Sequence, residues 1–396
     1  MTENGFHTVN NKNYDIPKIG IGMLGYGFMG KAHSNAYHKI SYMSWPPVAI
    51  PQLVAICGRN DKKVEEAAVR YKYQGYYTDW KQMVKDPSIE IFDNGSSDKM
   101  HFEPTVAAAK EGKHVFCEKP LAVSIAEAEE MLLAVQQSGV KHMCGFNYRF
   151  IPAVRLAKNI IEEGKLGKIY QFTGHYFHPF GSDPEEKVEN IWYAGPGHPG
   201  VLYGIGSHLI DIARFLAGEI DTVMGITKNF NKTRFDSNGK KHAIAGDECN
   251  AAIFEFTNGA LGSIETSCIA PGRMNHQFWE INGSKGSIYF DLEDLNHLHV
   301  CLKQNNRKDL SGFTKILVAE PEHPYHSIFY PQPGIALGWE DSFVAELNHF
   351  IDCIINNKSV EPYGATFYDG YINQLIIDAI EKSSVNGKKM KIAAEF

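Results

Sequence analysis

The sequence lacks the long apolar runs that a membrane protein needs. No stretch of its 396 residues approaches the roughly 18 uninterrupted apolar residues of a membrane-spanning helix, and residues 1–17 are polar, without the apolar core of a secretory signal. Its seven cysteines are scattered and form no C-x-x-C pair, which argues against a disulfide framework or a zinc ribbon and is typical of a reducing compartment. We therefore expect a cytoplasmic protein with no membrane partner and no metal.

The chain also lacks an excess of basic residues. Lys and Arg number 39 against 46 Asp and Glu, which leaves a formal net charge of −7 and no basic stripe of the kind that a nucleic-acid backbone requires. We therefore expect no nucleic-acid partner. Apolar residues make up 43% and charged residues 21%, an ordinary composition that excludes intrinsic disorder. At about 150 residues per domain, the length predicts two or three domains.

The first part of the chain alternates between strand and helix patterns. Apolar runs typical of buried strands occur at residues 18–24, 52–57, 89–93, 114–117 and 140–146. Helical spacing or good helix formers occupy residues 28–40, 64–71, 104–111 and 124–138. Strands that alternate with helices need crossover connections, so we expect residues 1–150 to form an α/β domain with a doubly wound parallel sheet.

The second half of the chain has a different pattern, in which hairpins dominate from Val223 onward. An Asn-Gly turn at 257–260 separates two strand patterns, and a Gly-Ser-Lys-Gly turn separates two more. Strand patterns occupy 168–177, 251–256, 261–268, 277–281 and 287–291, and helical patterns occupy 201–216, 339–355 and 365–384. We expect residues 151–396 to form an α+β domain with a large, mostly antiparallel sheet. Residues 303–337 give no readable pattern.

A glycine-rich turn is the first motif that carries chemistry. Residues Gly25-Tyr26-Gly27-Phe28-Met29-Gly30 form G-x-G-x-x-G directly after a predicted strand and at the start of a helix. The first glycine permits the tight turn, the second lets the backbone approach a pyrophosphate, and the third lets the helix pack on the strand. The helix N-terminus then offers unpaired N–H groups to the phosphates. A turn without a ligand is the alternative, but the strand–turn–helix context favours dinucleotide binding.

The end of the second strand bears on the choice between NAD and NADP. An acidic residue there would bind the ribose hydroxyls of NAD, but the chain has Cys57-Gly58-Arg59-Asn60. Arg59 could stack on adenine or meet a 2′-phosphate, and it could equally be a solvated loop residue. The residues alone favour NADP.

Three further motifs carry a family resemblance. They are Cys117-Glu118-Lys119-Pro120, Gly145-Phe146-Asn147-Tyr148-Arg149-Phe150 and Gly206-Ser207-His208-Leu209-Ile210-Asp211. With the turns at 258–262 and 283–287, residues 18–392 resemble the glucose–fructose oxidoreductase/inositol dehydrogenase/MocA family of sugar oxidoreductases. The resemblance implies a Rossmann NAD(P)-binding domain at 1–150 and a substrate-binding and oligomerisation domain at 151–396. It also implies a homo-oligomer, a dimer or a tetramer, formed through the second sheet.

The resemblance assigns catalytic roles to Lys119 and His208. Lys119 would lie between nicotinamide and sugar and polarise the reacting oxygen, and His208 would take the hydroxyl proton, which suits an imidazole whose pKa lies near the working pH. One departure puts the usual Lys–Asp–His group in doubt, because Gly204 stands where the family often has Asp. A second is Ser96-Ser97 in place of Thr-Pro after the third strand.

Other contacts are expected on the same basis. Aromatic faces pack on the C–H patches of a pyranose and imidazoles bind its hydroxyls. For Trp192 and His178, a core position and a surface position are the respective alternatives. Besides the glycine turn, Gly58 and Arg59, we expect cofactor contacts from Ser96, Ser97, His101, Glu118, Lys119 and Arg149. We expect substrate contacts from Lys119, Tyr148, Arg149, Tyr176, His178, Trp192 and His208.

These observations predict an NAD-dependent dehydrogenase. The Cys-Gly-Arg-Asn segment and the inserted loop at 41–51 resemble glucoside or levoglucosan-type 3-dehydrogenases, whose usual cofactor is NAD. We give this resemblance more weight than the residues at the end of the second strand, which favour NADP, and predict NAD. The enzyme would oxidise a secondary hydroxyl of a pyranose or glycoside, at C3, by hydride transfer to nicotinamide. The alternatives are an inositol dehydrogenase, a cofactor-retaining glycosidase or transhydrogenase, and a non-catalytic dinucleotide-binding sensor, which the loss at Gly204 suggests.

Overall fold

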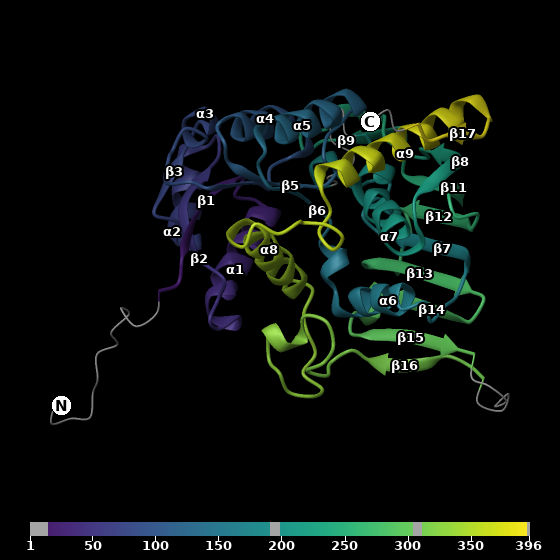
Figure 1. Ribbon diagram of the computed structural model, residues 1–396. Helices are drawn as coiled ribbons and strands as arrows, with labels where there is room; N and C mark the ends of the chain where they lie inside the picture. Colours follow the sequence, from purple (N-terminus) through teal and green to yellow (C-terminus); the bar gives the residue numbers. More distant parts are fainter. Residues whose placement is uncertain (1–14, 191–198, 304–310, 394–396) are drawn as a thin grey trace.

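The computed structural model describes residues 15–190, 199–303 and 311–393, which form two sheets with helices packed around them (Figure 1). The first sheet has six strands, all paired in parallel. Their spatial order is β3 (Gly75–Tyr77), β2 (Ile50–Cys57), β1 (Lys18–Leu24), β4 (Ile91–Asn94), β5 (His114–Glu118) and β6 (His142–Gly145). This confirms the doubly wound parallel sheet, whose strand order reverses between β1 and β4.

Local sequence sets the ends of the helices around this sheet. The Asn60 side chain accepts a hydrogen bond from the N–H of Lys63, and Ser124 caps its helix through the N–H of Glu127. Gly139, at φ 65°, ends the helix that Ser124 begins. The helices are α1 (Phe28–Met43), α2 (Asp61–Tyr71), α3 (Trp80–Met83), α4 (Phe102–Lys110) and α5 (Ile125–Ser138), with 3₁₀ turns at Asp98–Met100 and Asn147–Phe150.

The second sheet has nine strands and is antiparallel except where β12 pairs with β7. Its order confirms the predicted large, mostly antiparallel sheet. The strands are, from one edge to the other, β16 (Thr314–Leu317), β15 (His297–Leu302), β14 (Gly286–Asp291), β13 (His276–Gly283), β7 (Ile169–Phe177), β12 (Leu261–Ser267), β11 (Cys249–Phe256), β8 (Ile220–Lys228) and β17 (Met390–Lys391). A separate two-stranded ladder joins β9 (Thr233–Phe235) and β10 (Lys241–Ala243).

The two faces of the second sheet differ. Its inner face packs against α6 (Pro152–Glu162), α7 (Ser207–Ala217) and α9 (Phe367–Asn386). Its outer face carries no helix in the described part of the chain, as the right side of Figure 1 shows. The alternating burial of β11, in which every second residue is exposed, follows from this arrangement.

The C-terminal helices tie the two sheets together. Helix α8 (Asp341–Ile355) lies beside α1, and its Phe343 and Phe350 join the core built on Ile19 and Tyr37 (Figure 1). Helix α9 packs on α5 as well as on β8. The last part of the sequence therefore helps to build the core of the first domain.

Several elements differ in detail from the sequence prediction. The predicted helix at 201–216 begins as a π-helical turn, Leu202–Gly206, and becomes α-helical only at Ser207. The unreadable stretch contains β16 and a 3₁₀ turn at His326–Ile328. Strand β3 was not expected because three residues are too few to show a period. No helix among the described residues has the length and apolar character needed to cross a membrane.

Candidate active site

The glycine turn has the geometry of a dinucleotide site. Gly25 adopts φ +101°, and a Cβ there would lie 2.8 Å from the carbonyl oxygen of Gly95. A Cβ on Gly30 would lie 2.1 Å from the carbonyl oxygen of Gly25, whereas a Cβ on Gly27 would meet no atom within 4 Å. Gly27 precedes α1 and offers no side-chain cap, so open space and unpaired N–H groups coincide where a pyrophosphate would sit.

A cavity of about 450 Å³ opens at this turn. The ends of β1, β2 and β4 meet there because the carboxyl ends of parallel strands share one edge of a sheet. Gly58 lies against the Tyr26 ring. A Cβ on Gly58 would lie 2.1 Å from a carbon of that ring, so a side chain here would require the ring to move. The predicted cofactor residues that line this cavity are Gly25, Tyr26, Gly27, Phe28, Met29, Gly58, Arg59, Ser96 and Ser97.

A second cavity, of about 640 Å³, adjoins the first and shares Phe28, Met29 and Ser96 with it. It lies between the first sheet and the inner face of the second. Of the predicted residues, it brings together Glu118, Lys119, Tyr148, Tyr176, His178 and His208. The sequence prediction missed Asp98, Asn147, Phe180, Ile205, Asn275, Trp339 and Phe343, which also line it.

Lys119 follows directly on β5 and reaches across to the second domain. Its Nζ donates a hydrogen bond to the carbonyl oxygen of Gly204, 2.9 Å away, in the π-helical turn before α7. π-helical turns are often found at functional sites. A backbone carbonyl thus meets the lysine at the position where the family often has a carboxylate.

His208 is the second residue of α7 and is buried. Its ring stacks on Tyr148, with centroids 4.4 Å apart and an interplanar angle of 26°. Nδ1 is buried and has no hydrogen-bond partner among the described residues, and the residue lines the second cavity. Burial, Lys119 and His178 lower the pKa of His208 well below its usual value, not near working pH as the sequence suggested. The imidazole is therefore neutral and able to accept a proton.

Polar and aromatic side chains line the rest of the second cavity. The hydroxyl groups of Tyr148 and Tyr176 lie 2.8 Å apart, and Tyr176 donates to Oδ1 of Asn275 at 2.7 Å. His178 stacks on Phe180, with centroids 4.3 Å apart, and burial lowers the pKa of His178 to about 4. His178 does not take the alternative position on the surface, because it is buried and lines the cavity. Trp192 lies outside the described residues.

Two predicted contacts are not where the sequence placed them. Arg149 lines neither cavity; its guanidinium donates to Asp211 at 2.5 and 2.8 Å and pairs with Asp369 at 3.2 Å in the buried interior. A buried guanidinium needs such partners, and Asp369 is too far along the chain to be foreseen. His101 is also buried. Its Nδ1 lies 2.8 Å from the carbonyl oxygen of Pro120, and its Nε2 lies 3.4 Å from the carbonyl oxygen of Ser96.

The Glu118 carboxylate is hydrogen-bonded to a buried histidine. His33 of α1 lies between two carboxylates, with Nδ1 3.0 Å from Asp93 and Nε2 3.1 Å from Glu118. Burial alone would lower the pKa of His33, but the two carboxylates outweigh it and raise the pKa to about 10. The other Glu118 oxygen accepts from the backbone N–H of Lys119 at 3.1 Å.

A Rossmann sheet, a glycine turn and an adjoining cavity with a lysine and a neutral histidine define the class of nicotinamide-dependent oxidoreductases. Residues 19–146 match the NAD-binding Rossmann fold of the GFO/IDH/MocA oxidoreductase family, and residues 158–392 match that family's C-terminal alpha/beta domain. The chain therefore belongs to this family, as the sequence motifs predict.

Two curated relatives and one solved structure are similar over almost the whole chain. Levoglucosan dehydrogenase of Pseudarthrobacter phenanthrenivorans is 35% identical over 382 residues, covering 93% of this chain and 97% of that protein. The scyllo-inositol 2-dehydrogenase (NAD(+)) of Bacillus subtilis is 28% identical, covering 94% and 95%. A structure of levoglucosan dehydrogenase in complex with NADH and L-sorbose has a TM-score of 0.91 at 35% identity, covering 96% of this chain and 100% of that one.

Proposed function

We propose that this NAD-dependent oxidoreductase acts on a secondary hydroxyl of a pyranose, a glycoside or an anhydrosugar, with His208 and Lys119 as its catalytic residues. The observation that carries the proposal is the joining of two cavities at Phe28, Met29 and Ser96, one at the glycine turn and one that holds both residues. Similar proteins support the substrate class, because both curated relatives are named for the oxidation of a polyhydroxylated ring.

NAD is the cofactor that the first cavity fits. Space opens at Gly27, and the N-terminus of α1 is free to receive a pyrophosphate. When bound, NAD supplies the hydride acceptor. The solved relative in complex with NADH supports NAD over NADP, although Arg59 lines this cavity.

The residues of the second cavity then divide the remaining chemistry between them. The lowered pKa keeps His208 neutral, so that one of its two ring nitrogens is unprotonated. In the tautomer that carries its proton on Nδ1, Nε2 accepts the hydroxyl proton. Lys119 donates a hydrogen bond to the same oxygen and stabilises the negative charge that develops there. The Gly204 carbonyl holds the ammonium in place without cancelling its charge.

The shape of the second cavity suits a sugar ring. Tyr148, Tyr176, Phe180, Trp339 and Phe343 present aromatic surface, and Asn147, Asn275, His178 and Lys119 present polar atoms. Among ring positions we propose C3, which would yield a 3-keto sugar. An inositol is the second candidate, and the inositol dehydrogenase similarity favours it.

A substrate screen tests this proposal. Purified protein is mixed with NAD or NADP and levoglucosan, aryl glucosides, monosaccharides, and myo- or scyllo-inositol, and the absorbance of the reduced nicotinamide is followed. We expect the highest kcat/KM with NAD and a glycoside or anhydrosugar. Highest activity with an inositol would favour the second candidate. Reduction of neither cofactor by any sugar would contradict the proposal, and turnover without added NAD would indicate a cofactor-retaining enzyme.

We also propose that the chain self-associates through the outer face of its second sheet. Four apolar side chains, which we call the outer patch, are exposed there by 42 to 61%: Met224, Ile226, Ile253 and Leu261. They lie on the adjacent strands β8, β11 and β12. An exposed apolar patch on a sheet is typical of a protein–protein interface, and a second copy of the chain is the partner that the family resemblance implies.

A further inference from the structure

Three residues of the second cavity form a chain of hydrogen bonds whose direction can be worked out. Burial raises the pKa of both Tyr148 and Tyr176, so each hydroxyl keeps its single proton. Tyr176 gives its proton to Oδ1 of Asn275 at 2.7 Å, and the 2.8 Å contact between the two hydroxyls therefore has Tyr148 as donor. Tyr148 then has only acceptor lone pairs to offer, toward the side-chain N–H groups of Trp339 and Asn275 as well as toward the cavity. Asn275 has its Nδ2 as donor.

The loop that carries Asn275 is itself held from the outer side of the sheet. Glu293 follows β14, and its Oε1 accepts from the backbone N–H groups of Met274 at 2.8 Å and Asn275 at 3.3 Å. Its Oε2 accepts from Arg273 at 3.3 Å. A single carboxylate thus binds three consecutive residues of the loop.

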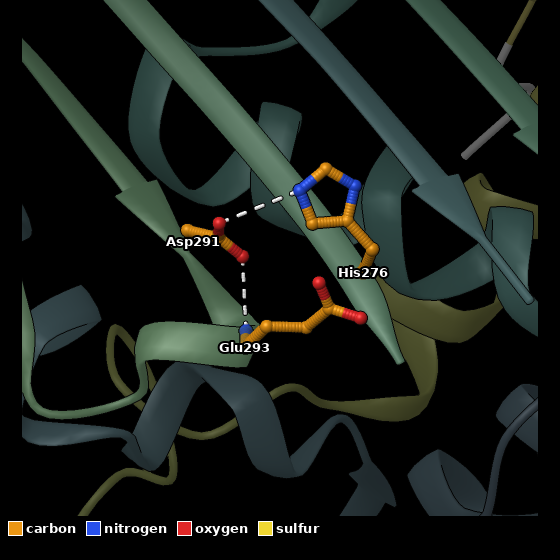
Figure 2. A group of neighbouring side chains, drawn as sticks. All are labelled: His276, Asp291 and Glu293. Atoms are coloured by element: carbon orange, nitrogen blue, oxygen red, sulfur yellow. Dashed lines mark hydrogen bonds and ion pairs between the residues drawn. The ribbon is translucent and has the colours of Figure 1, made fainter. Parts of the chain in front are cut away.

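Glu293 belongs to a cluster that resembles a metal site. Figure 2 shows Asp291 between His276 and the backbone N–H of Glu293, with the Glu293 carboxylate on the same side. The potential ligand atoms all lie within 4.8 Å of one another. Each group already has a protein partner, however: His276 contacts His175 at 3.1 Å and Asp291 at 3.4 Å, and Glu293 binds the loop. We interpret the cluster as a loop clamp.

From this arrangement we infer that Tyr148 and Asn275 are specificity-determining residues and that Glu293 is a positioning residue for Asn275. This inference rests on the proposed function and extends it. The oxygen of Tyr148 accepts a hydrogen bond from a substrate hydroxyl, and Nδ2 of Asn275 donates one to a substrate oxygen. Because the Tyr148 ring stacks on His208, the hydroxyl that Tyr148 binds belongs to the same sugar ring as the reacting hydroxyl. The substrate is thus a ring with at least one free hydroxyl beside the one oxidised.

Deoxy and fluoro analogues of the substrate test the polarity of this subsite, because fluorine cannot donate a hydrogen bond. At one ring position, we expect both analogues to lose on the order of 10–10²-fold in kcat/KM, since an unpaired buried acceptor is costly. In Tyr148→Phe that loss should shrink to about 2-fold or less. At a second position the fluoro analogue should outperform the deoxy analogue, and Asn275→Asp should remove the difference. Analogue losses that Tyr148→Phe leaves unchanged would overturn the assignment.

Variants of Glu293 test the clamp. Glu293→Ala should raise KM for the sugar roughly 10-fold and leave kcat and KM for NAD within about 3-fold, because the loop touches the sugar and not the dinucleotide. Glu293→Gln keeps an acceptor oxygen and should restore most of the loss, and Glu130→Gln on the exposed side of α5 should change nothing. A fall in kcat with unchanged KM would contradict the positioning role. So would a KM for the sugar that depends on Mn²⁺, Zn²⁺ or EDTA, which would make the cluster a metal site.

A failure of this inference can be distinguished from a failure of the proposed function. Oxidation of the parent sugar by the wild-type protein tests the function, whereas only the ratios between analogues and between variants test the inference. If the wild-type protein oxidised no sugar, the function would fail, and calorimetric binding of the same analogues would still report the polarity at Tyr148. Equal binding of parent, deoxy and fluoro compounds in that case would overturn the inference as well.

Discussion

At the level of single residues, the proposed role of His208 as the base predicts how kcat/KM responds to pH. Its pKa is lowered well below 6.5 by burial, by Lys119 and by His178. A base with a lowered pKa stays unprotonated until the pH falls through that lower value. We therefore predict that kcat/KM for sugar oxidation stays constant as the pH falls through 6.5 and declines only in more acidic solution. His208→Asn should lose on the order of 10²–10⁴-fold and also lose that acid limb.

A pH profile of kcat/KM for both proteins checks this prediction. An acid limb at or above 6.5 in the wild-type enzyme would contradict the lowered pKa. An unchanged limb in His208→Asn, or a rate close to that of wild type, would assign the proton to another group.

Some residues of the site are readable from sequence and others are not. Lys119 and His208 lie in motifs whose spacing survives in this chain, and both line the second cavity. Arg149 lies in an equally recognisable motif, but its partners Asp211 and Asp369 draw it into the interior. Asn275 gives no signal at all, because its role depends on a loop that meets Tyr176 from 99 residues away.

At the level of elements, the π-helical turn before α7 meets Lys119 with a backbone carbonyl, at the position where the family resemblance implies an Asp side chain. Gly204 lies in this helical turn, so its backbone can accept a side chain, and its carbonyl holds Lys119. We predict that Gly204→Asp shifts the acid limb of kcat/KM to higher pH, because a nearby carboxylate stabilises the imidazolium of His208 and raises its pKa. Gly204→Asn has nearly the same size without the charge and should not shift the limb. Equal profiles for the two variants would contradict the electrostatic reason.

Helix α1 places the charged imidazolium of His33 in the core, and this charge makes the free energy of unfolding depend on pH. The pKa of His33 is about 10 in the folded protein, against 6.5 for an unperturbed histidine. A raised pKa adds stability that is complete below 6.5 and lost as the pH rises through about 10. We predict that His33→Gln costs about 3–5 kcal/mol near neutral pH, because it leaves Asp93 and Glu118 without their buried cation.

Urea unfolding at several pH values checks this prediction. The wild-type protein should lose stability between pH 6.5 and 10 more steeply than His33→Gln. Parallel curves for the two proteins would contradict a cationic His33.

The elements themselves were largely predictable. Continuous apolar runs gave the buried strands β1, β2 and β5, and Asn-Gly and Gly-Ser-Lys-Gly turns gave the hairpins β11–β12 and β13–β14. The pattern within one strand or helix does not show which distant segment it will pack against. Helix α8 was expected, but its place against α1 follows from apolar residues such as Phe343 and Phe350 meeting a surface built more than 300 residues earlier.

At the scale of the whole molecule, the outer patch predicts an oligomer. Replacing Ile226 and Ile253 together with Asp places charge in the centre of the patch, so we predict dissociation to monomers with little loss of folding. Both side chains are about 60% exposed in the single chain. Val69→Asp, at an apolar residue on α2 that is 77% exposed, is the control away from the patch and should leave the mass unchanged. Light scattering after gel filtration measures the mass, and a wild-type protein that is already monomeric would contradict the proposal.

Deuterium transfer measures whether a hydride passes from a sugar carbon in the second cavity to the cofactor of the first. Sugars deuterated at one ring carbon each are incubated with the enzyme and NAD, and the reduced nicotinamide is analysed by mass spectrometry. We predict deuterium in the nicotinamide from the C3-labelled sugar alone, with a primary isotope effect on kcat/KM, and much slower transfer by Lys119→Met. Transfer from another carbon would move the site of oxidation. Absence of deuterium from the nicotinamide with every labelled sugar would contradict hydride transfer from sugar to NAD, and with it the proposed function.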